Sequence, residues 1–197
     1  MRTFVYFSSS ARTSGNFDMN DLMSAGRMDI AMHIIINAFF LSHKLRDDVT
    51  LHLVFYGMPD PPKHIEIRVN EETKLSKKDV ANLIKKILYK YKPGQKTEVV
   101  PGCFIEKKSF LDVIEELSAE GKEIFILDEG GVSIRDADLG KNSVFIIGDH
   151  NDNGLPRKEL KRLKKKFNPV SVGPEVYFAS QVVTIINNEL DLREIEN

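Results

Sequence analysis

The sequence lacks most of the features that mark specialised protein classes. It contains one cysteine, Cys103, and no tryptophan, so an intramolecular disulfide framework and a zinc site built from several cysteines are excluded. No apolar run approaches the roughly 20 residues that a membrane-spanning helix needs. The start, MRTFVYFSSSART, has no apolar core typical of a signal peptide. We therefore expect a cytoplasmic protein without membrane contact.

Neither sign of charge is in excess. Lys and Arg total 28 and Asp and Glu total 29, which gives a net charge of −1. This balance excludes a histone-like polycation, although a basic face can still occur within a neutral total. Hydrophobic residues make up 42% of the chain, which excludes intrinsic disorder. Because no linker or repeat divides the chain, residues 1–197 are predicted to form a single domain.

Short segments rich in β-branched and aromatic residues alternate with longer segments of helical periodicity. The predicted strands are Thr3–Phe7, Val49–Tyr56, His64–Val69, Thr97–Val100, Glu123–Asp128 and Ser143–Gly148. The predicted helices are Leu22–Leu45, Lys77–Tyr91, Lys107–Glu120, Lys158–Lys166 and Glu175–Asn188. This alternation predicts an α/β fold with a mostly parallel sheet and helices on both faces.

Two of these strands, and a further short strand predicted within residues 168–173, end in segments that contain glycine. These segments are residues 127–131 (LDEGG), 147–156 (IGDHNDNGLP) and 171–173 (SVG). In open α/β sheets, ligands bind beyond the carboxyl ends of the strands, so the three segments are predicted to line one pocket, although each alone could be a simple turn. No G-x-G-x-x-G or P-loop motif occurs. The acidic side chains of Asp149 and Asp152 would repel phosphates and favour a cationic or zwitterionic ligand.

The order of these segments resembles the SPOUT class of RNA methyltransferases. The strand ends in Ile147-Gly148-Asp149, the following loop ends in Gly154-Leu155-Pro156, and Ser171-Val172-Gly173 leads into a final apolar helix. The N-terminal half narrows the resemblance. Gly26-Arg27-Met28-Asp29, residues 37–43 (NAFFLSH) and residues 53–57 (LVFYG) are similar to archaeal tRNA pseudouridine-54 N1-methyltransferases.

This resemblance implies a fold, a cofactor and a reaction. The implied fold has a deep trefoil knot at its C-terminal end, and the implied cofactor is S-adenosylmethionine, bound between the knot loops. The implied reaction is N1-methylation of pseudouridine at position 54 in the tRNA T-loop. The cofactor-binding residues that the resemblance implies are Leu127, Gly148, Leu155, Ser171, Val172, Gly173, Pro174, Glu175 and Val176.

The resemblance also implies a homodimer formed through the C-terminal helix. Its interface would include part of the side chains of Tyr177, Phe178, Val182, Ile185 and Ile186. Burial of these side chains within one chain would explain their apolar character as well.

Arg27 and Asp29 are the candidate catalytic residues. The N1 nitrogen of pseudouridine carries a proton, so the site should stabilise negative charge on the uracil carbonyls or accept that proton. From the resemblance, Arg27 is predicted to bind a phosphate or a uracil oxygen, and Asp29 to orient the base or take its proton. A surface ion pair at the start of a helix is the alternative. The histidines lack the paired helical spacing of a metal site, so no metal is predicted.

Residues 157–166 (RKELKRLKKK) carry seven basic side chains and one acid, which gives a local charge of +6. A helix of this charge is predicted to bind the phosphate backbone of RNA, with a solvated helix face as the alternative.

Three other functions remain open at this point: a ribosomal-RNA pseudouridine N1-methyltransferase of the same class, a non-catalytic RNA-binding protein, and a small-molecule α/β enzyme unrelated to RNA.

Overall fold

A computed structural model describes residues 1–70, 73, 75–149 and 155–196. The strands are β1 (Arg2–Ser8), β2 (Val49–Phe55), β3 (Lys63–Arg68), β4 (Thr97–Val100), β5 (Cys103–Glu106), β6 (Glu123–Ser133), β7 (Ser143–Ile147) and β8 (Asn168–Ser171). The helices are α1 (Met28–Phe39), the 3-10 helix η1 (Lys77–Asp79), α2 (Val80–Tyr89), α3 (Phe110–Ala119), α4 (Arg157–Lys164) and α5 (Ala179–Glu196). Within these described residues, no helix is long and apolar enough to cross a membrane.

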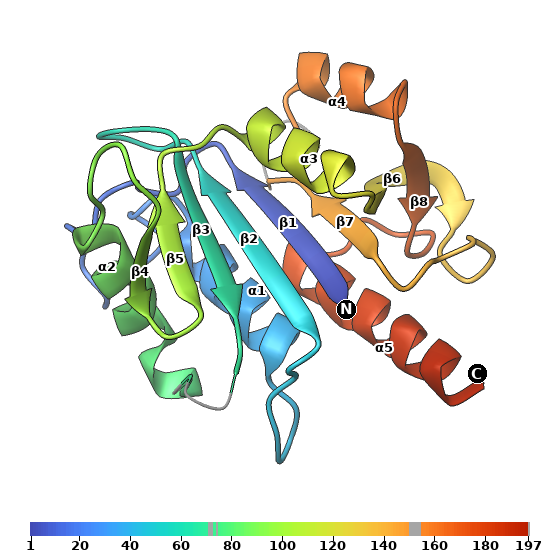
Figure 1. The fold of residues 1–197 in the computed structure, drawn as a ribbon, viewed down its shortest axis with the longest axis horizontal. Helices are drawn as coiled ribbons and strands as arrows, with labels where there is room; N and C mark the ends of the chain where they lie inside the picture. Colours follow the sequence, from blue (N-terminus) through green and yellow to red (C-terminus); the bar gives the residue numbers. More distant parts are fainter. Residues whose placement is uncertain (71–72, 74, 150–154, 197) are drawn as a thin grey trace.

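All eight strands form one sheet in the order β4-β5-β3-β2-β1-β7-β6-β8 (Figure 1). Within this order, the five neighbouring strands β2, β1, β7, β6 and β8 run parallel to one another. Strands β3, β5 and β4 extend the sheet with antiparallel pairings. The parallel half therefore brings the carboxyl ends of β1, β7, β6 and β8 to one edge of the sheet.

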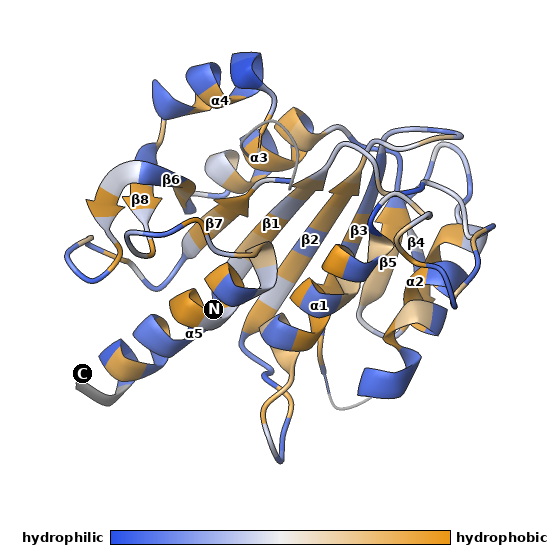
Figure 2. Ribbon diagram, turned by 180° about the vertical axis from the view of Figure 1, so that it is seen from behind, coloured by the Kyte–Doolittle hydropathy of each residue, from blue (hydrophilic) through white to orange (hydrophobic). Residues whose placement is uncertain are grey.

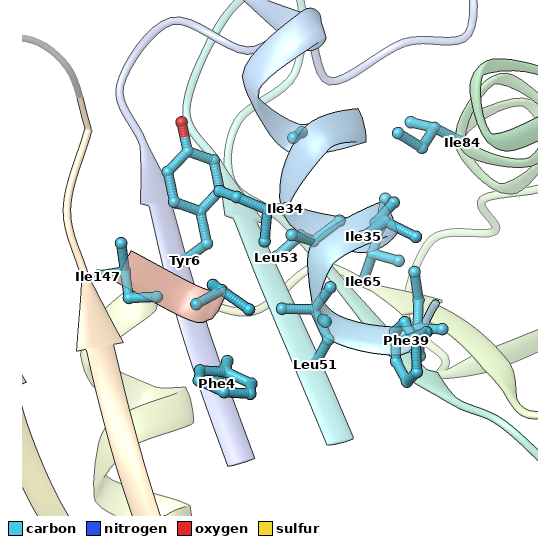
Figure 3. Packing of buried hydrophobic residues seen from close by; sticks show 14 of the residues in the cluster. Phe4, Tyr6, Ile34, Ile35, Phe39, Leu51, Leu53, Ile65, Ile84 and Ile147 are labelled. Atoms are coloured by element: carbon cyan, nitrogen blue, oxygen red, sulfur yellow. The ribbon is translucent and has the colours of Figure 1, made fainter. Parts of the chain in front are cut away.

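Helices cover both faces of the sheet, which confirms the predicted α/β fold with a mostly parallel sheet. One buried cluster joins α1, α2 and α5 to side chains such as Phe4, Tyr6 and Leu53 (Figure 3). A second cluster joins α3 and α4 to Val5 and Ile146 on the opposite face. Figure 2 shows α1 and α5 lying across the same face, where the two helices contact each other.

The first helix is shorter than the predicted segment 22–45. Gly26 and Arg27 both have left-handed backbone conformations, with φ of 70° and 62°, so the helix begins only at Met28. A Cβ atom at Gly26 would lie 1.8 Å from the Ser10 carbonyl oxygen, and this close approach requires glycine. At the other end, Phe40 is extended and pairs with Leu45 in a β-bridge.

Other elements also differ from the prediction. The last helix was predicted for residues 175–188, but α5 begins at Ala179 and runs to Glu196. Gly130 and Gly131 belong to β6 instead of a loop, because β6 pairs with β8 across a register shift between Leu127 and Val132. Strand β5 was not predicted. Cys103 lies in this strand, and its burial raises the pKa of its thiol to about 12.

The N-terminus and the last helix are joined by ion pairs. The buried Arg2 guanidinium lies 2.7 Å from Asp48, 2.9 Å from Asp191 and 3.1 Å from Glu194. Arg46 binds the other oxygen of Asp191 at 2.5 Å. Because a buried arginine needs several acceptors, these contacts hold α5 in one position against β1.

Candidate active site

A cavity of about 1000 Å³ lies at the carboxyl ends of β7 and β8, beside residues 127–130 in the middle of β6. The start of α1 and the start of α5 form its other walls. The sheet order explains this position, because parallel strands end at the same edge and the connecting segments surround the space beyond them. A volume of this size accommodates a nucleoside-sized ligand.

The α1 wall carries the predicted pair Arg27 and Asp29. The Arg27 Nε and Nη2 atoms each donate a hydrogen bond of 3.0 Å to the two carboxylate oxygens of Asp29. Asp29 also lies in the first turn of α1, where the helix dipole favours a negative charge. These hydrogen bonds from Arg27 hold the pKa of the Asp29 carboxyl below its usual range. Because an ionised carboxylate of lowered pKa is a weak proton acceptor, this geometry favours an orienting role for Asp29.

The loop after β1 holds the backbone next to Arg27 in place. The Ser10 hydroxyl donates a hydrogen bond of 3.0 Å to the Gly26 carbonyl. The neighbouring Ser9 donates from its backbone nitrogen and its hydroxyl to one oxygen of Asp149, at 2.7 and 2.6 Å. The loop after β1 therefore connects the α1 wall to the end of β7.

Most of the predicted cofactor-binding residues line this cavity. They are Leu127, Gly148, Ser171, Val172, Gly173, Glu175 and Val176. The other two predicted residues lie elsewhere: Leu155 is buried in the α3–α4 cluster, and Pro174 is exposed outside the set of lining residues. Asp152 and Gly154, which belong to the predicted loop, are outside the described residues.

Gly173 is packed tightly beside an aromatic ring. A Cβ atom at this position would lie 3.0 Å from the Tyr177 Cε2 atom, and Tyr177 itself lines the cavity. A larger side chain at position 173 would therefore have to displace Tyr177 or fill the cavity.

The segments predicted to line one pocket also contribute Asp128, Glu129, Gly130, Ile147 and Asp149 to the lining. Other lining residues lie outside those segments and were not predicted to line the pocket. They are Ile30, His33, Leu160, Lys164, Val170 and the segment Tyr177–Ser180 with Val182. For His33 a signal was present, since it follows Asp29 by four residues and such residues share one face of a helix.

Among the described residues, the lining carries more negative than positive charge. Five carboxylates, from Asp29, Asp128, Glu129, Asp149 and Glu175, face the two cations Arg27 and Lys164. Lys164 of α4 forms an ion pair with Asp128. The excess of carboxylates suits a ligand that carries positive charge, as the sequence predicted.

A second polar cluster lies on strands β2, β3 and β5. The His52 and His64 rings share a hydrogen bond of 2.9 Å, and His64 lies 3.0 Å from Glu106. With Glu66, these histidines could offer ligand atoms to a metal ion. However, Glu66 is paired with Arg68 at 2.6 Å and with Lys96 at 2.7 Å, and a further cation beside them would be repelled. The cluster is therefore better described as a hydrogen-bond network.

Helix α4 presents its basic side chains to solvent beside the cavity. A shallow hollow of about 400 Å³ lies along it, lined by Arg157, Leu160, Lys161, Lys164 and Lys165. Leu160 and Lys164 also line the larger cavity. The positive helix and the negatively charged cavity are thus adjacent.

The predicted interface residues divide into two groups. Phe178 is 77% exposed and the neighbouring Val176 is 81% exposed. Val182 and Ile186 are buried in the core of the single chain, and Tyr177 and Ile185 are partly buried against it. Only part of the predicted set is therefore available to a partner.

Comparison with known proteins gives one family over nearly the whole chain. The family model described as "Putative SAM-dependent RNA methyltransferase" matches residues 1–195. The tRNA (pseudouridine(54)-N(1))-methyltransferase of Methanococcoides burtonii is 37% identical, covering 97% of this chain and 96% of its own length. The protein of the same name from Thermococcus gammatolerans is 34% identical, covering 97% of each. These matches confirm the resemblance found in the sequence.

Among solved structures, the chain is similar to Archaeoglobus fulgidus Nep1 bound to S-adenosylhomocysteine. The TM-score is 0.65 at 17% sequence identity, and the match covers 98% of this chain and 99% of the other. At this identity the likeness supports the fold.

Proposed function

We propose that this chain, which belongs to the family of S-adenosylmethionine-dependent RNA methyltransferases, methylates N1 of pseudouridine 54 in the tRNA T-loop. The observation that carries the proposal is the position of Arg27 and Asp29 in the wall of the same cavity as the three predicted strand ends. The relatives at 37% and 34% identity are named for this reaction.

The cavity suits S-adenosylmethionine as the methyl donor. When bound, this cofactor supplies a methyl group on a positively charged sulfur. The five carboxylates of the lining match its positive charges, and Leu127, Val172 and Val176 offer apolar surface to an adenine ring. The residues proposed to hold it are Leu127, Gly148, Ser171, Val172, Gly173, Glu175 and Val176.

Arg27 and Asp29 are proposed to act on the target base from the opposite wall. The Asp29 carboxylate holds the Arg27 guanidinium through two hydrogen bonds, and guanidinium N–H groups outside this pair can bind a uracil oxygen or phosphate. Positive charge at a uracil carbonyl stabilises the anion that forms as N1 loses its proton. The protein thus contributes positioning and charge stabilisation, which an in-line methyl transfer needs most.

We further propose that residues 172–178 take part in the trefoil knot. Strand β8 lies at the outer edge of the sheet beyond β6, whereas α5 packs on α1 and receives hydrogen bonds from Arg2 of β1. The chain must therefore return past the ends of β6 and β7 within this short segment. Such a path is the one that a threaded C-terminus requires.

The tRNA backbone is proposed to lie along α4, and a second copy of the chain to cover Phe178. The basic charge of α4 beside the cavity supports the first proposal. The large exposed surface of the Phe178 ring supports the second. With tRNA as its substrate, the protein is expected to act in the cytoplasm.

The test is methyl transfer from labelled S-adenosylmethionine to four RNA substrates. These are a tRNA transcript with pseudouridine at position 54, the same transcript with uridine there, and ribosomal-RNA hairpins with and without pseudouridine. We expect N1-methylpseudouridine only in the first. Transfer to the ribosomal hairpin alone would identify a ribosomal-RNA enzyme, and no transfer to any RNA would contradict the proposed activity.

A further inference from the structure

The N1 proton of the target base needs an acceptor, and the Arg27–Asp29 pair is poorly suited to be one. Both Asp29 oxygens already accept hydrogen bonds from Arg27. Among the other carboxylates of the lining, Asp128 is paired with Lys164 and Asp149 accepts two hydrogen bonds from Ser9. Carboxylates are also weak bases at neutral pH, because their ordinary pKa lies near 4.

Among the residues that the structure describes, His33 is the one histidine that lines the cavity. It lies one turn after Asp29 on α1, and its side chain is exposed. Its carbonyl accepts a hydrogen bond of 2.7 Å from the Asn37 amide, and the Asn37 side chain bonds to Thr184 of α5 at 2.8 Å. These contacts hold the His33 turn of α1 beside the start of α5, where Ala179 and Ser180 line the same cavity.

We propose that His33 accepts the N1 proton of the target pseudouridine during methyl transfer. This inference rests on the proposed function and names a catalytic residue for it. As the bond between N1 and the methyl carbon forms, the bond between that carbon and the donor sulfur breaks, and its electron pair stays on sulfur. The proton leaves N1 for an imidazole nitrogen, so the sulfonium becomes a neutral thioether and the imidazole becomes an imidazolium.

The charges around His33 support this transfer. The titratable and charged groups among the described lining residues are Arg27 and Asp29 from the start of α1, Asp128 and Glu129 from β6, Asp149 after β7, Lys164 from α4, and Glu175 and Tyr177 after β8. Carboxylates outnumber cations in this set, and Asp29 is one helical turn away on the same face. Negative charge stabilises the imidazolium that the transfer produces.

The experiment compares His33→Gln and His33→Ala with the wild-type protein on tRNA that carries pseudouridine 54. Histidine is the side chain whose protonation ordinarily changes between about pH 5 and 8, so rates are measured across that range and to about pH 9. We expect kcat of both variants to fall about 100-fold, with the KM for the donor within about twofold. The wild-type rate should decline at acidic pH, and the two variants should not show this decline. Added imidazole should restore activity to His33→Ala. His43→Gln, which changes an exposed histidine outside the cavity, is the matched control and should keep the wild-type rate.

Each other outcome overturns the inference. If the wild-type protein transfers no methyl group, the proposed function itself fails. If it is active and His33→Gln retains its kcat, His33 is not the proton acceptor. A loss of kcat with an unchanged pH profile and no rescue by imidazole would assign His33 a positioning role. A loss of donor binding measured by calorimetry would make it part of the binding site.

Discussion

At the scale of single residues, Arg27 is constrained by its backbone as well as by its side chain. It has a φ of 62° although it is not glycine, a conformation that costs on the order of 1–3 kcal/mol. Gly26 allows the preceding turn to pack against Ser10, and Asp29 binds the guanidinium from the first turn of α1. The strained turn thus presents Arg27 at the wall of the cavity.

Asp29→Asn tests whether this pair acts in catalysis. Asparagine keeps the size of the side chain but loses the charge that holds Arg27, so the guanidinium should no longer be fixed. We expect kcat for pseudouridine methylation to fall by roughly 10- to 100-fold, while donor affinity measured by calorimetry stays unchanged. Asp47→Asn, at an exposed position outside the cavity, is the control. Wild-type activity of Asp29→Asn would leave the pair with a structural role only.

Glu106→Gln tests the buried polar network. Hydrogen bonding to His64 lowers the pKa of the Glu106 carboxyl from 4.5 to about 2. A lowered pKa means that the stabilisation is present above the unfolded value and is lost as pH falls from about 4.5 through 2. At pH 7 the variant should lose roughly 1–2 kcal/mol of unfolding free energy, and this deficit should shrink towards pH 2.5. Urea unfolding at both pH values measures it, and an equal deficit at both would refute the assignment.

At this scale, the sequence pointed to the Arg27–Asp29 pair but not to the buried contact between His52 and His64. Arg27 and Asp29 were predicted as site residues because a family motif of four consecutive residues carries them. The contact between His52 and His64 was not, because it depends on the antiparallel register of β2 and β3, which neither strand encodes alone. Their spacing of twelve residues fits no metal or catalytic motif.

At the scale of elements, the segment after β8 forms one wall of the cavity. Gly173→Trp should raise the dissociation constant for S-adenosylhomocysteine at least about tenfold, because its side chain would meet the Tyr177 ring or enter the cavity. Gly140→Trp is the matched control, since Gly140 is exposed and does not line the cavity. Isothermal calorimetry gives both constants. Unchanged binding to Gly173→Trp would remove this segment from the donor site.

Helix α4 should contribute to RNA affinity through charge alone. Lys161→Ala should weaken tRNA binding and reduce the slope of log affinity against log salt by about 0.7–0.9, as expected for one lost phosphate contact. Lys141→Ala, which changes an exposed lysine before β7, should leave the slope unchanged. Filter binding at several salt concentrations measures this, and equal slopes for both variants would show that α4 is a solvated face.

Element boundaries were predictable only where local chemistry sets them. The central strands followed from their apolar composition, and α4 from its charge. The start of α1 was missed because Arg27 adopts a conformation that its residue type does not favour. The extension of β6 through Gly130 and Gly131 was missed because it depends on β6 pairing with β8 on both sides of these glycines, at Leu127 and at Val132, which local preference does not show.

At the scale of the whole molecule, the sheet divides into two parts. The parallel part from β2 to β8 ends at the cavity, and the antiparallel strands β3, β5 and β4 enlarge the core away from it. Arg2 and Arg46 then fix α5 across the parallel part. The α/β class followed from the alternation of segments, whereas the antiparallel edge depends on long-range pairing that periodicity does not contain.

Assembly should depend on the exposed apolar side chains beside the cavity. Phe178→Glu should shift a dimer towards monomers in sedimentation velocity, because the phenyl ring is largely exposed in the single chain and would be buried by a second copy. Met58→Glu, at another exposed apolar position, should sediment like the wild type. A wild-type protein that sediments as a monomer at all concentrations would contradict the proposed homodimer.

The most direct test of the central claim is a crystal structure of the protein with S-adenosylhomocysteine at saturating concentration. The ligand should lie in the cavity between residues 127–130 of β6 and the ends of β7 and β8, with its sulfur facing the Arg27–Asp29 wall. A ligand bound at another place, or a cavity that stays empty under these conditions, would contradict the account.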